Sequence, residues 1–165
     1  MNVMHCAAIL EASIRQEIEA TTGQAPGELQ PFLAAVGKFQ GEFELLLDRA
    51  QYTNIDTGRY PEVEAMTLLG NDGDWQEVLQ QIGPLGEKAL AALTTIWMIQ
   101  ALVEKSGQFY QQAALNSAHP STRLFFRSLT EIKGMLRRRV DGLLRVLYNQ
   151  VWSDIGFAPV LLGKD

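Results

Sequence analysis

An apolar seam near the end of the chain, over residues 125–151, constrains the fold more than any other feature. Large apolar residues recur there at steps of three and four, a spacing that places them on one face of an α-helix. The seam consists of Phe125, Leu129, Ile132, Leu136, Val140, Leu143, Leu147 and Val151. One helix cannot bury such a seam alone, so the sequence predicts that other long helices pack against it.

Three further stretches have the same periodicity and few glycines or prolines. The four predicted long helices cover residues 2–21, 28–52, 85–117 and 120–154. The connection between the second and third is rich in turn-forming residues, and we expect only short helical pieces in it, at 62–69 and 75–82. Asp74 and Glu77 have the spacing of a helix N-cap and its reciprocal carboxylate.

Link lengths predict how the four helices are connected. A short link makes the two helices of each pair antiparallel, whereas the long connection can travel the length of the bundle and make the second and third helices parallel. The expected fold is therefore all-α. It is an antiparallel four-helix bundle with a long crossover between helices two and three, in a single domain of residues 1–165.

Composition narrows the class of protein. The apolar fraction of 47% and the charged fraction of 20% are typical of a globular chain. Cys6 is the only cysteine, which excludes an internal disulfide and a two-cysteine metal clip. Neither a secretory leader nor an apolar run of membrane-spanning length is present. A cytoplasmic protein that does not bind membranes is therefore expected.

The charge is divided unevenly along the chain. Residues 1–120 have a balance of −9 and residues 121–165 a balance of +4. The split favours pairing between oppositely charged helices, and an anion-binding face is the alternative. Arg137, Arg138 and Arg139 are consecutive, so they point around most of a helix and form no single basic stripe. Nucleic acid is not an expected partner.

Apolar residues at the far end of the fourth helix cover a wide arc. Together with aromatic residues and the C-terminal tail they predict a homodimer face. These residues are Leu143, Val146, Leu147, Val151, Trp97, Trp152 and Phe157, with the tail 156–165 expected to fold back over one end of the bundle.

Residues 101–131, ALVEKSGQFYQQAALNSAHPSTRLFFRSLTE, carry a resemblance to a known family. They contain a Glu-Lys pair, a Phe-Tyr pair followed by two alanines, a proline that opens the next helix, and a Phe-x-x-Leu step. This segment resembles the third and fourth helices of the rubrerythrin group of ferritin-like proteins. The likeness extends over about 50 residues, and the rest of the chain is similar only in layout.

The resemblance implies a ferritin-like bundle, a fold that in this family holds two metal ions with four carboxylates and two histidines. The comparison is anchored without gaps on Tyr110, Pro120 and Phe126. In that register the third-helix carboxylate falls on Val103, and the Glu-x-x-His of the fourth helix falls on Lys133 and Leu136. These side chains cannot replace the ligands. The implied protein lacks a complete di-metal site, needs no cofactor, and acts as an interaction or scaffold protein with an unidentified protein partner rather than as an enzyme.

The alternative is a rubrerythrin-like di-iron or metal-binding redox protein with a non-standard carboxylate site. Its ligands would be Glu11 on the first helix seam, Glu44 at the family spacing from it, Glu104 and Glu131. Glu104 is one residue from the family position, however, and one residue rotates a side chain by about 100° around the helix. A surface position for Glu104 and Glu131 is the simpler interpretation.

Lys133 suggests a further hypothesis. If it turns inward, its ammonium group could pair with Glu11 or Glu104 and replace the positive charge of the metal. It could equally extend along the seam to water, and the sequence leaves both open. A third functional hypothesis is a carrier of a small apolar ligand, bound where Gln100 and Gly107 interrupt the third seam.

Overall fold

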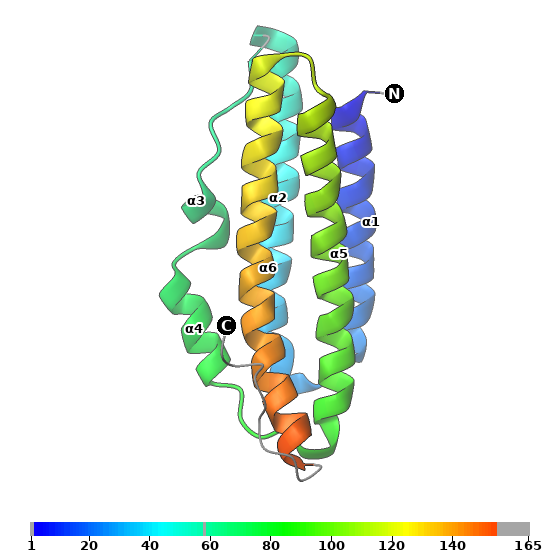
Figure 1. Ribbon diagram of the computed structural model, residues 1–165, viewed down its shortest axis with the longest axis vertical. Coiled ribbons are helices and arrows are strands. Elements are labelled where there is room, and N and C mark those ends of the chain that lie inside the picture. The colour runs from blue at the N-terminus through cyan, green and yellow to red at the C-terminus, as the bar shows by residue number, and fades with distance from the viewer. Residues whose placement is uncertain (1, 58, 155–165) are drawn as a thin grey trace.

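The computed structural model describes residues 2–57 and 59–154, and these two ranges contain helices, turns and loops but no β-strand. Four long helices lie side by side along the long axis of the molecule (Figure 1). They are α1 (Val3–Gln24), α2 (Gln30–Thr57), α5 (Ala89–Asn116) and α6 (Pro120–Asp154). The prediction of an all-α fold is confirmed.

The long helices pack in a defined order. α5 and α6 contact each other along most of their length, while α1 packs against α2 and α5. α2 and α5 run in the same direction, and α1 and α6 run opposite to them (Figure 1). Lys88 Nζ lies 3.2 Å from Glu28 Oε1, because the starts of α5 and α2 are at the same end of the molecule.

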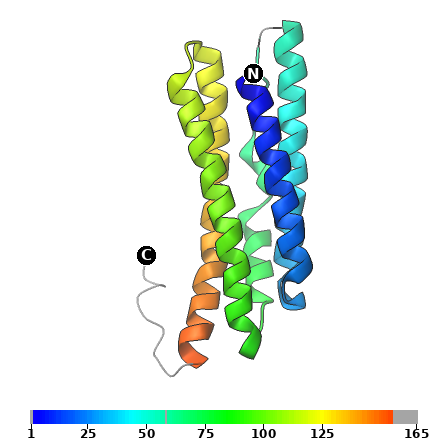
Figure 2. The same ribbon diagram turned by 90° about the vertical axis from the view of Figure 1, so that its right-hand side faces the viewer.

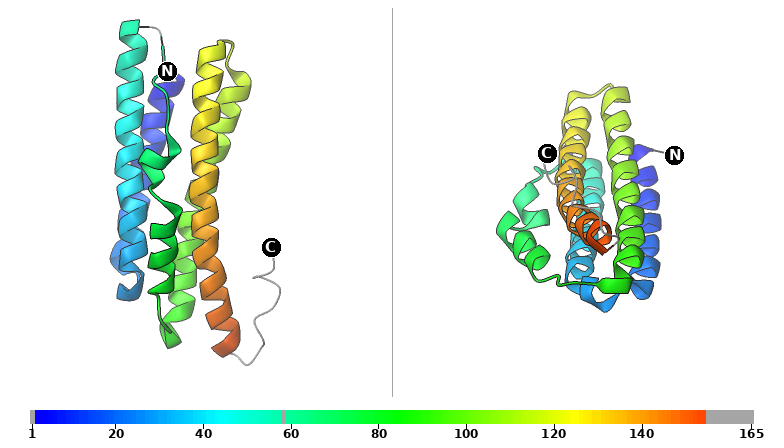
Figure 3. Two further views of the ribbon diagram at one scale, coloured as in Figure 1. Left: turned by 90° about the vertical axis from the view of Figure 1, so that its left-hand side faces the viewer. Right: turned by 60° about the horizontal axis from the view of Figure 1, so that its bottom comes forward.

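The connection between α2 and α5 passes along the outside of the molecule, beside α2 and α6 (Figure 3). It contains two short α-helices, and two 3₁₀ turns precede α2 and α5. These elements are α3 (Ala65–Leu69), α4 (Asp72–Gln80), η1 (Gly27–Leu29) and η2 (Gly86–Lys88). α4 contacts both α2 and α6, so the connection covers the seam between them.

The predicted start of α4 is wrong by one helical turn. Asn71, not Asp74, is the N-cap, and its side chain accepts a 3.0 Å hydrogen bond from the backbone N–H of Gly73. Asp74 lies in the first turn instead. The preceding Gly70 has a φ of 72°, a conformation that glycine adopts without strain. This turn redirects the chain before Asn71, so the helix begins earlier than the Asp74–Glu77 spacing predicts.

One aromatic side chain fixes α4 on the bundle. The Trp75 ring packs edge-on against Phe32 of α2, with ring centroids 5.6 Å apart, and its indole N–H donates a hydrogen bond to the carbonyl of Leu69. Arg139 of α6 lies over the same ring at 5.2 Å and donates to the Leu69 carbonyl at 2.9 Å. The connection is therefore joined to both α2 and α6.

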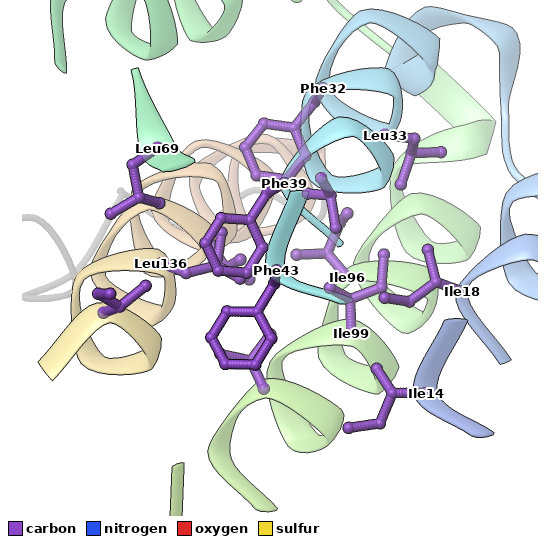
Figure 4. Close-up of a cluster of buried hydrophobic side chains, with 14 of the residues drawn as sticks. Ile14, Ile18, Phe32, Leu33, Phe39, Phe43, Leu69, Ile96, Ile99 and Leu136 are labelled. Carbon is purple, nitrogen blue, oxygen red and sulfur yellow. The ribbon is translucent and has the colours of Figure 1, made fainter. Parts of the chain in front are cut away.

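The core lies between the four long helices and is apolar along most of its length. Figure 4 shows Phe32, Phe39 and Phe43 of α2 pointing into it, with isoleucines from α1 and α5 and Leu136 of α6 around them. The three phenylalanines are no more than 1% exposed. They recur at steps of seven and four residues, which explains why they share one helix face.

Two predictions concern parts of the chain beyond the long helices. Within the described ranges, no helix combines the length and the apolar character that a membrane span requires. The predicted folding back of the tail, residues 156–165, lies outside the described residues, as does Phe157.

Candidate functional site

A carboxylate lies in the middle of the apolar core. Glu11 occupies the buried face of α1 between Ala7 and Ile14, and its side chain is 0% exposed. An ionised carboxylate transferred from water to such surroundings is strongly destabilised unless hydrogen-bond donors and an opposite charge replace the lost water. The contacts of Glu11 therefore determine what this part of the molecule can do.

Each of the other three long helices provides one partner for Glu11. Lys133 Nζ of α6 donates to Glu11 Oε1 at 2.9 Å, and Gln40 Nε2 of α2 donates to the same oxygen at 3.0 Å. The Tyr110 hydroxyl of α5 donates to Glu11 Oε2 at 2.6 Å. We call these four residues the buried polar centre; Gln40, Tyr110 and Lys133 are at most 3% exposed.

The ammonium group of Lys133 has aromatic neighbours as well as a carboxylate. Its Nζ lies 4.2 Å from the centroid of the Phe43 ring and 5.4 Å from that of Phe39. The negative face of an aromatic ring attracts a cation, and this attraction is larger away from water. Lys133 is thus held on one side by the Glu11 carboxylate and on another by two phenylalanines of α2.

Burial and charge act in opposite directions on the protonation of Lys133. Burial lowers the pKa of the Lys133 ammonium from its ordinary value, and the nearby charges of Glu11 and Glu44 oppose that lowering. For Tyr110 the effects add. Burial and the Glu11 charge both raise the pKa of the Tyr110 hydroxyl well above its ordinary value, so the hydroxyl stays protonated and donates a hydrogen bond to Glu11.

Glu44 lies beside the buried polar centre and has a different partner. Its carboxylate accepts two hydrogen bonds from Arg15 Nε, at 3.2 and 3.0 Å, and its side chain is 23% exposed. Glu44 directly follows Phe43, whose ring lies 4.2 Å from Lys133 Nζ, and its charge adds to the raising of the Tyr110 pKa and opposes the lowering of the Lys133 pKa. Two carboxylates, one from α1 and one from α2, therefore lie near the centre, each paired with a basic side chain.

The remaining candidate ligands are at the surface. Glu104 is 43% exposed and lies 3.6 Å from Arg137, and Glu131 is exposed. Val103 and Leu136 are buried apolar residues at 2% and 1% exposure. The structure thus does not bring Glu11, Glu44, Glu104 and Glu131 together. Over the described part of the chain, no three histidine, cysteine, aspartate or glutamate side chains are grouped so that they could hold a metal ion.

The predicted binding place for a small apolar ligand, at Gln100 and Gly107, is occupied by contacts with neighbouring residues. The Gln100 amide donates a hydrogen bond to Asp141 of α6. A Cβ on Gly107 would lie 3.6 Å from Lys133 Cβ, which is ordinary contact. The hollow beside Gly107 is an open groove between α5 and α6, lined also by Val103 and Gly134. Both interruptions of the seam thus face α6.

The sequence reasoning missed two members of the buried polar centre. Tyr110 is predicted only as a residue of the third-helix seam and as an anchor of the family comparison, and no prediction concerns Gln40. A usable signal was present for Gln40, which directly follows Phe39 and lies four residues after Val36 on the buried face. A polar residue at such a position requires a buried partner for the same reason that Glu11 does.

Comparisons of the chain with models of protein families, with curated proteins and with solved structures found no match. The chemistry of the buried polar centre follows from its own atoms. Both oxygens of Glu11 accept hydrogen bonds, and the negative charge is balanced by Lys133 at contact distance. The arrangement is that of an ion pair within a hydrogen-bond network in which each buried side-chain nitrogen and oxygen of the described residues has a partner.

Proposed function

We propose that this chain is a rubrerythrin-related, ferritin-like four-helix bundle in which an ion pair replaces the metal site. The bundle acts by contact with other proteins, as an interaction or scaffold protein, and not as a metal enzyme. The observation that carries this proposal is the 2.9 Å pair between Lys133 Nζ and Glu11 Oε1. It lies between the four long helices, where the resemblance places the metal ions.

The arrangement of the helices supports the fold part of the proposal. Ferritin-like bundles have two pairs of long helices joined by one long crossover. Here α2 and α5 run in the same direction, and a connection containing α3 and α4 links their opposite ends (Figure 1). The segment that carries the resemblance, residues 101–131, spans the turn between α5 and α6.

The contacts of Glu11 support the part of the proposal that says the protein has no metal site. A metal cation at this carboxylate would have to lie beside the buried ammonium of Lys133, and two like charges in a low-dielectric core repel strongly. It would also have to displace the hydrogen bonds from Gln40 and Tyr110. Val103 and Leu136 offer no ligand atoms in exchange.

The alternative function, an iron-dependent redox protein, is favoured by one observation. Glu44 of α2 pairs at 3.0 Å with Arg15 of α1, which lies one helical turn after Glu11, so both carboxylates lie where α1 and α2 pack together. Two carboxylates could bind iron if Lys133 and Arg15 moved away from them. The alternative thus requires the two ion pairs of the centre to break on metal binding.

The experiment that separates the two functions is a metal count. Purified metal-free protein is titrated with ferrous iron without oxygen, desalted, and measured by elemental analysis. The proposal predicts no stoichiometric iron in the wild type, and no difference between the wild type and the Glu44→Gln variant. Two ions per chain, lost in Glu44→Gln and accompanied by an absorption change on admitting air, would establish the alternative.

A further inference from the structure

The first half of α5 contains no charged side chain. Residues 89–103, ALAALTTIWMIQALV, make about four helical turns without an aspartate, glutamate, lysine or arginine. A helix that lacks charge around its whole circumference is typical of a fully covered environment, because surface helices place charged residues on their outer face. Among the residues that the structure describes, these turns are covered on one side and exposed on the other.

The uncovered side carries large apolar residues. Leu90 is 61% exposed, Trp97 42% and Met98 46%. Smaller uncharged residues between them are exposed as well. We call this surface the α5 outer face; it consists of Leu90, Ala91, Thr94, Trp97, Met98 and Ala101. Figure 2 shows α5 in the foreground, beside α1.

The neighbouring helices leave this face uncovered for a geometric reason. The Thr21 hydroxyl contacts Met98 Sδ at 3.0 Å, which places these two residues at one level of the bundle. α1 ends three residues later, at Gln24, whereas α5 continues past Met98 to Leu90, about 12 Å further along its axis. On the other side the Trp97 ring lies in an edge-to-face arrangement with Tyr148 of α6, with centroids 5.5 Å apart, and Trp97 remains 42% exposed.

The apolar arc of α6, for which a homodimer face is predicted, is too buried to form a dimer interface. Leu143 and Leu147 are 0% exposed, and Val146 and Val151 are half-buried. These residues pack within the chain because the face of α6 that carries them is turned toward the core. Of the residues predicted for the dimer face, Trp97 is exposed, and it belongs to α5.

We propose that the α5 outer face binds the same face of a second copy of this chain, around a two-fold axis. This inference deepens the proposed function, on which it rests, by naming one partner. A two-fold axis brings each residue near it against the same residue of the other copy, so any charge there meets a like charge. The chain has a net charge of −5, and this face avoids that repulsion over its whole length.

The ends of the face support self-association too. The charged residues at its two ends, Lys88 of η2 and Glu104 of α5, are each held in an ion pair, with Glu28 at 3.2 Å and with Arg137 at 3.6 Å. Each pair balances a charge at one end of the face. The apolar anchors all come from one helix, whereas a standard interface buries about 800 Å² per partner over some 20–30 residues, so we expect a weak dimer of roughly micromolar affinity.

Sedimentation velocity on the full chain, from low to high micromolar concentration, tests this interface. The wild type is expected to shift from monomer to dimer across the range. Leu90→Glu should weaken the dimer about tenfold or more, because it puts a carboxylate from each copy into an apolar contact. Leu90 is 61% exposed in the monomer, so the new charge stays in water and the chain should still fold.

The matched control is Leu124→Glu, which changes an equally large apolar residue, 66% exposed, at the start of α6. It should dimerise like the wild type. Met98→Glu repeats the test at a second position, and the thermal midpoint verifies folding of each variant. A wild type that stays monomeric, or a Leu90→Glu variant that dimerises as tightly, would overturn the proposal. Iron counts report separately on the proposed function, so the two can fail independently.

Discussion

Lys133 Nζ and Glu11 Oε1 lie 2.9 Å apart, with 1% and 0% of the two side chains exposed to solvent. The two residues are 122 positions apart in sequence, on the last and first long helices. Their charges are balanced by each other, by two further hydrogen-bond donors to Glu11 and by the rings of Phe43 and Phe39 beside Lys133. This pair and its partners determine how the molecule should respond to substitution and to pH.

Replacing Glu11 by Gln should destabilise the fold strongly. The change leaves the Lys133 ammonium buried without a counter-charge, which typically costs about 3–5 kcal/mol in the free energy of unfolding. Urea unfolding followed by circular dichroism measures it. The control is Glu104→Gln, which breaks an ion pair with Arg137 at the surface. The Glu104 and Arg137 side chains are 43% and 47% exposed, so the loss should be less than about 1 kcal/mol. Equal losses in the two variants would show that the buried pair is unimportant.

Tyr110 should make the fold sensitive to alkaline pH. Its pKa in the folded state is raised above the ordinary value of 10.0, so above that pH the folded protein binds a proton that the unfolded chain has lost. The contribution of Tyr110 to stability is therefore complete below about pH 10 and decreases as the pH rises further. Unfolding free energies of the wild type and Tyr110→Phe, compared at about pH 8 and about pH 11, isolate this effect. A wild type that loses no more stability than Tyr110→Phe would refute it.

Lys133 should be the least reactive of the described lysines. Amine acylation requires an accessible neutral amine, and Lys133 is 1% exposed, whereas Lys38, Lys88 and Lys105 are exposed. Brief acylation of the folded protein should modify those three lysines and leave Lys133 unmodified, and peptide mass spectrometry detects the difference. Acylation in urea should modify all four. Early modification of Lys133 in the folded protein would contradict its inward position.

Gly107→Ala should stabilise the protein. Alanine is favoured over glycine in a helix interior by about 0.5–1 kcal/mol, and the new Cβ would lie 3.6 Å from Lys133 Cβ, an ordinary contact. Gly142→Ala is the matched comparison in α6, because its Cβ would approach Leu79 Cδ1 to 3.3 Å and force a small displacement. Thermal unfolding should rank Gly107→Ala above Gly142→Ala. The reverse order would show that α5 and α6 are packed more closely at Gly107 than the structure indicates.

The sequence was sufficient to predict an all-α fold and the apolar seams of the long helices, because the 3.6-residue period is a local property of the chain. The seam of α6 from Phe125 to Leu147 is buried as its spacing predicted. Helix ends were less predictable. α5 begins at Ala89 instead of residue 85, because Gly86 adopts a φ of 58° and a 3₁₀ turn precedes the helix. Such a conformation depends on a single backbone torsion, which periodicity does not encode.

The candidate site was only partly predictable, for a different reason. That Glu11 lies on a buried face follows from its spacing to Ala7 and Ile14, and its need for a partner follows from its charge. Whether Lys133 turns inward, and whether it then pairs with Glu11 or with Glu104, depends on how the helices that carry these residues are offset along their axes. Offset between helices is set by the packing of whole faces. The roles of Gln40 and Tyr110 depend on the same offset.

The most direct measurement of the central claim is a double-mutant cycle on the buried pair, with the wild type, Glu11→Leu, Lys133→Met and the double variant compared by urea unfolding. If the pair is the structural centre of the bundle, each single variant loses several kcal/mol. The double variant should then be more stable than the sum of those losses predicts by about 2 kcal/mol or more, because neither charge is left unpaired. Losses that simply add would contradict the claim, because they would mean that Glu11 and Lys133 do not depend on each other.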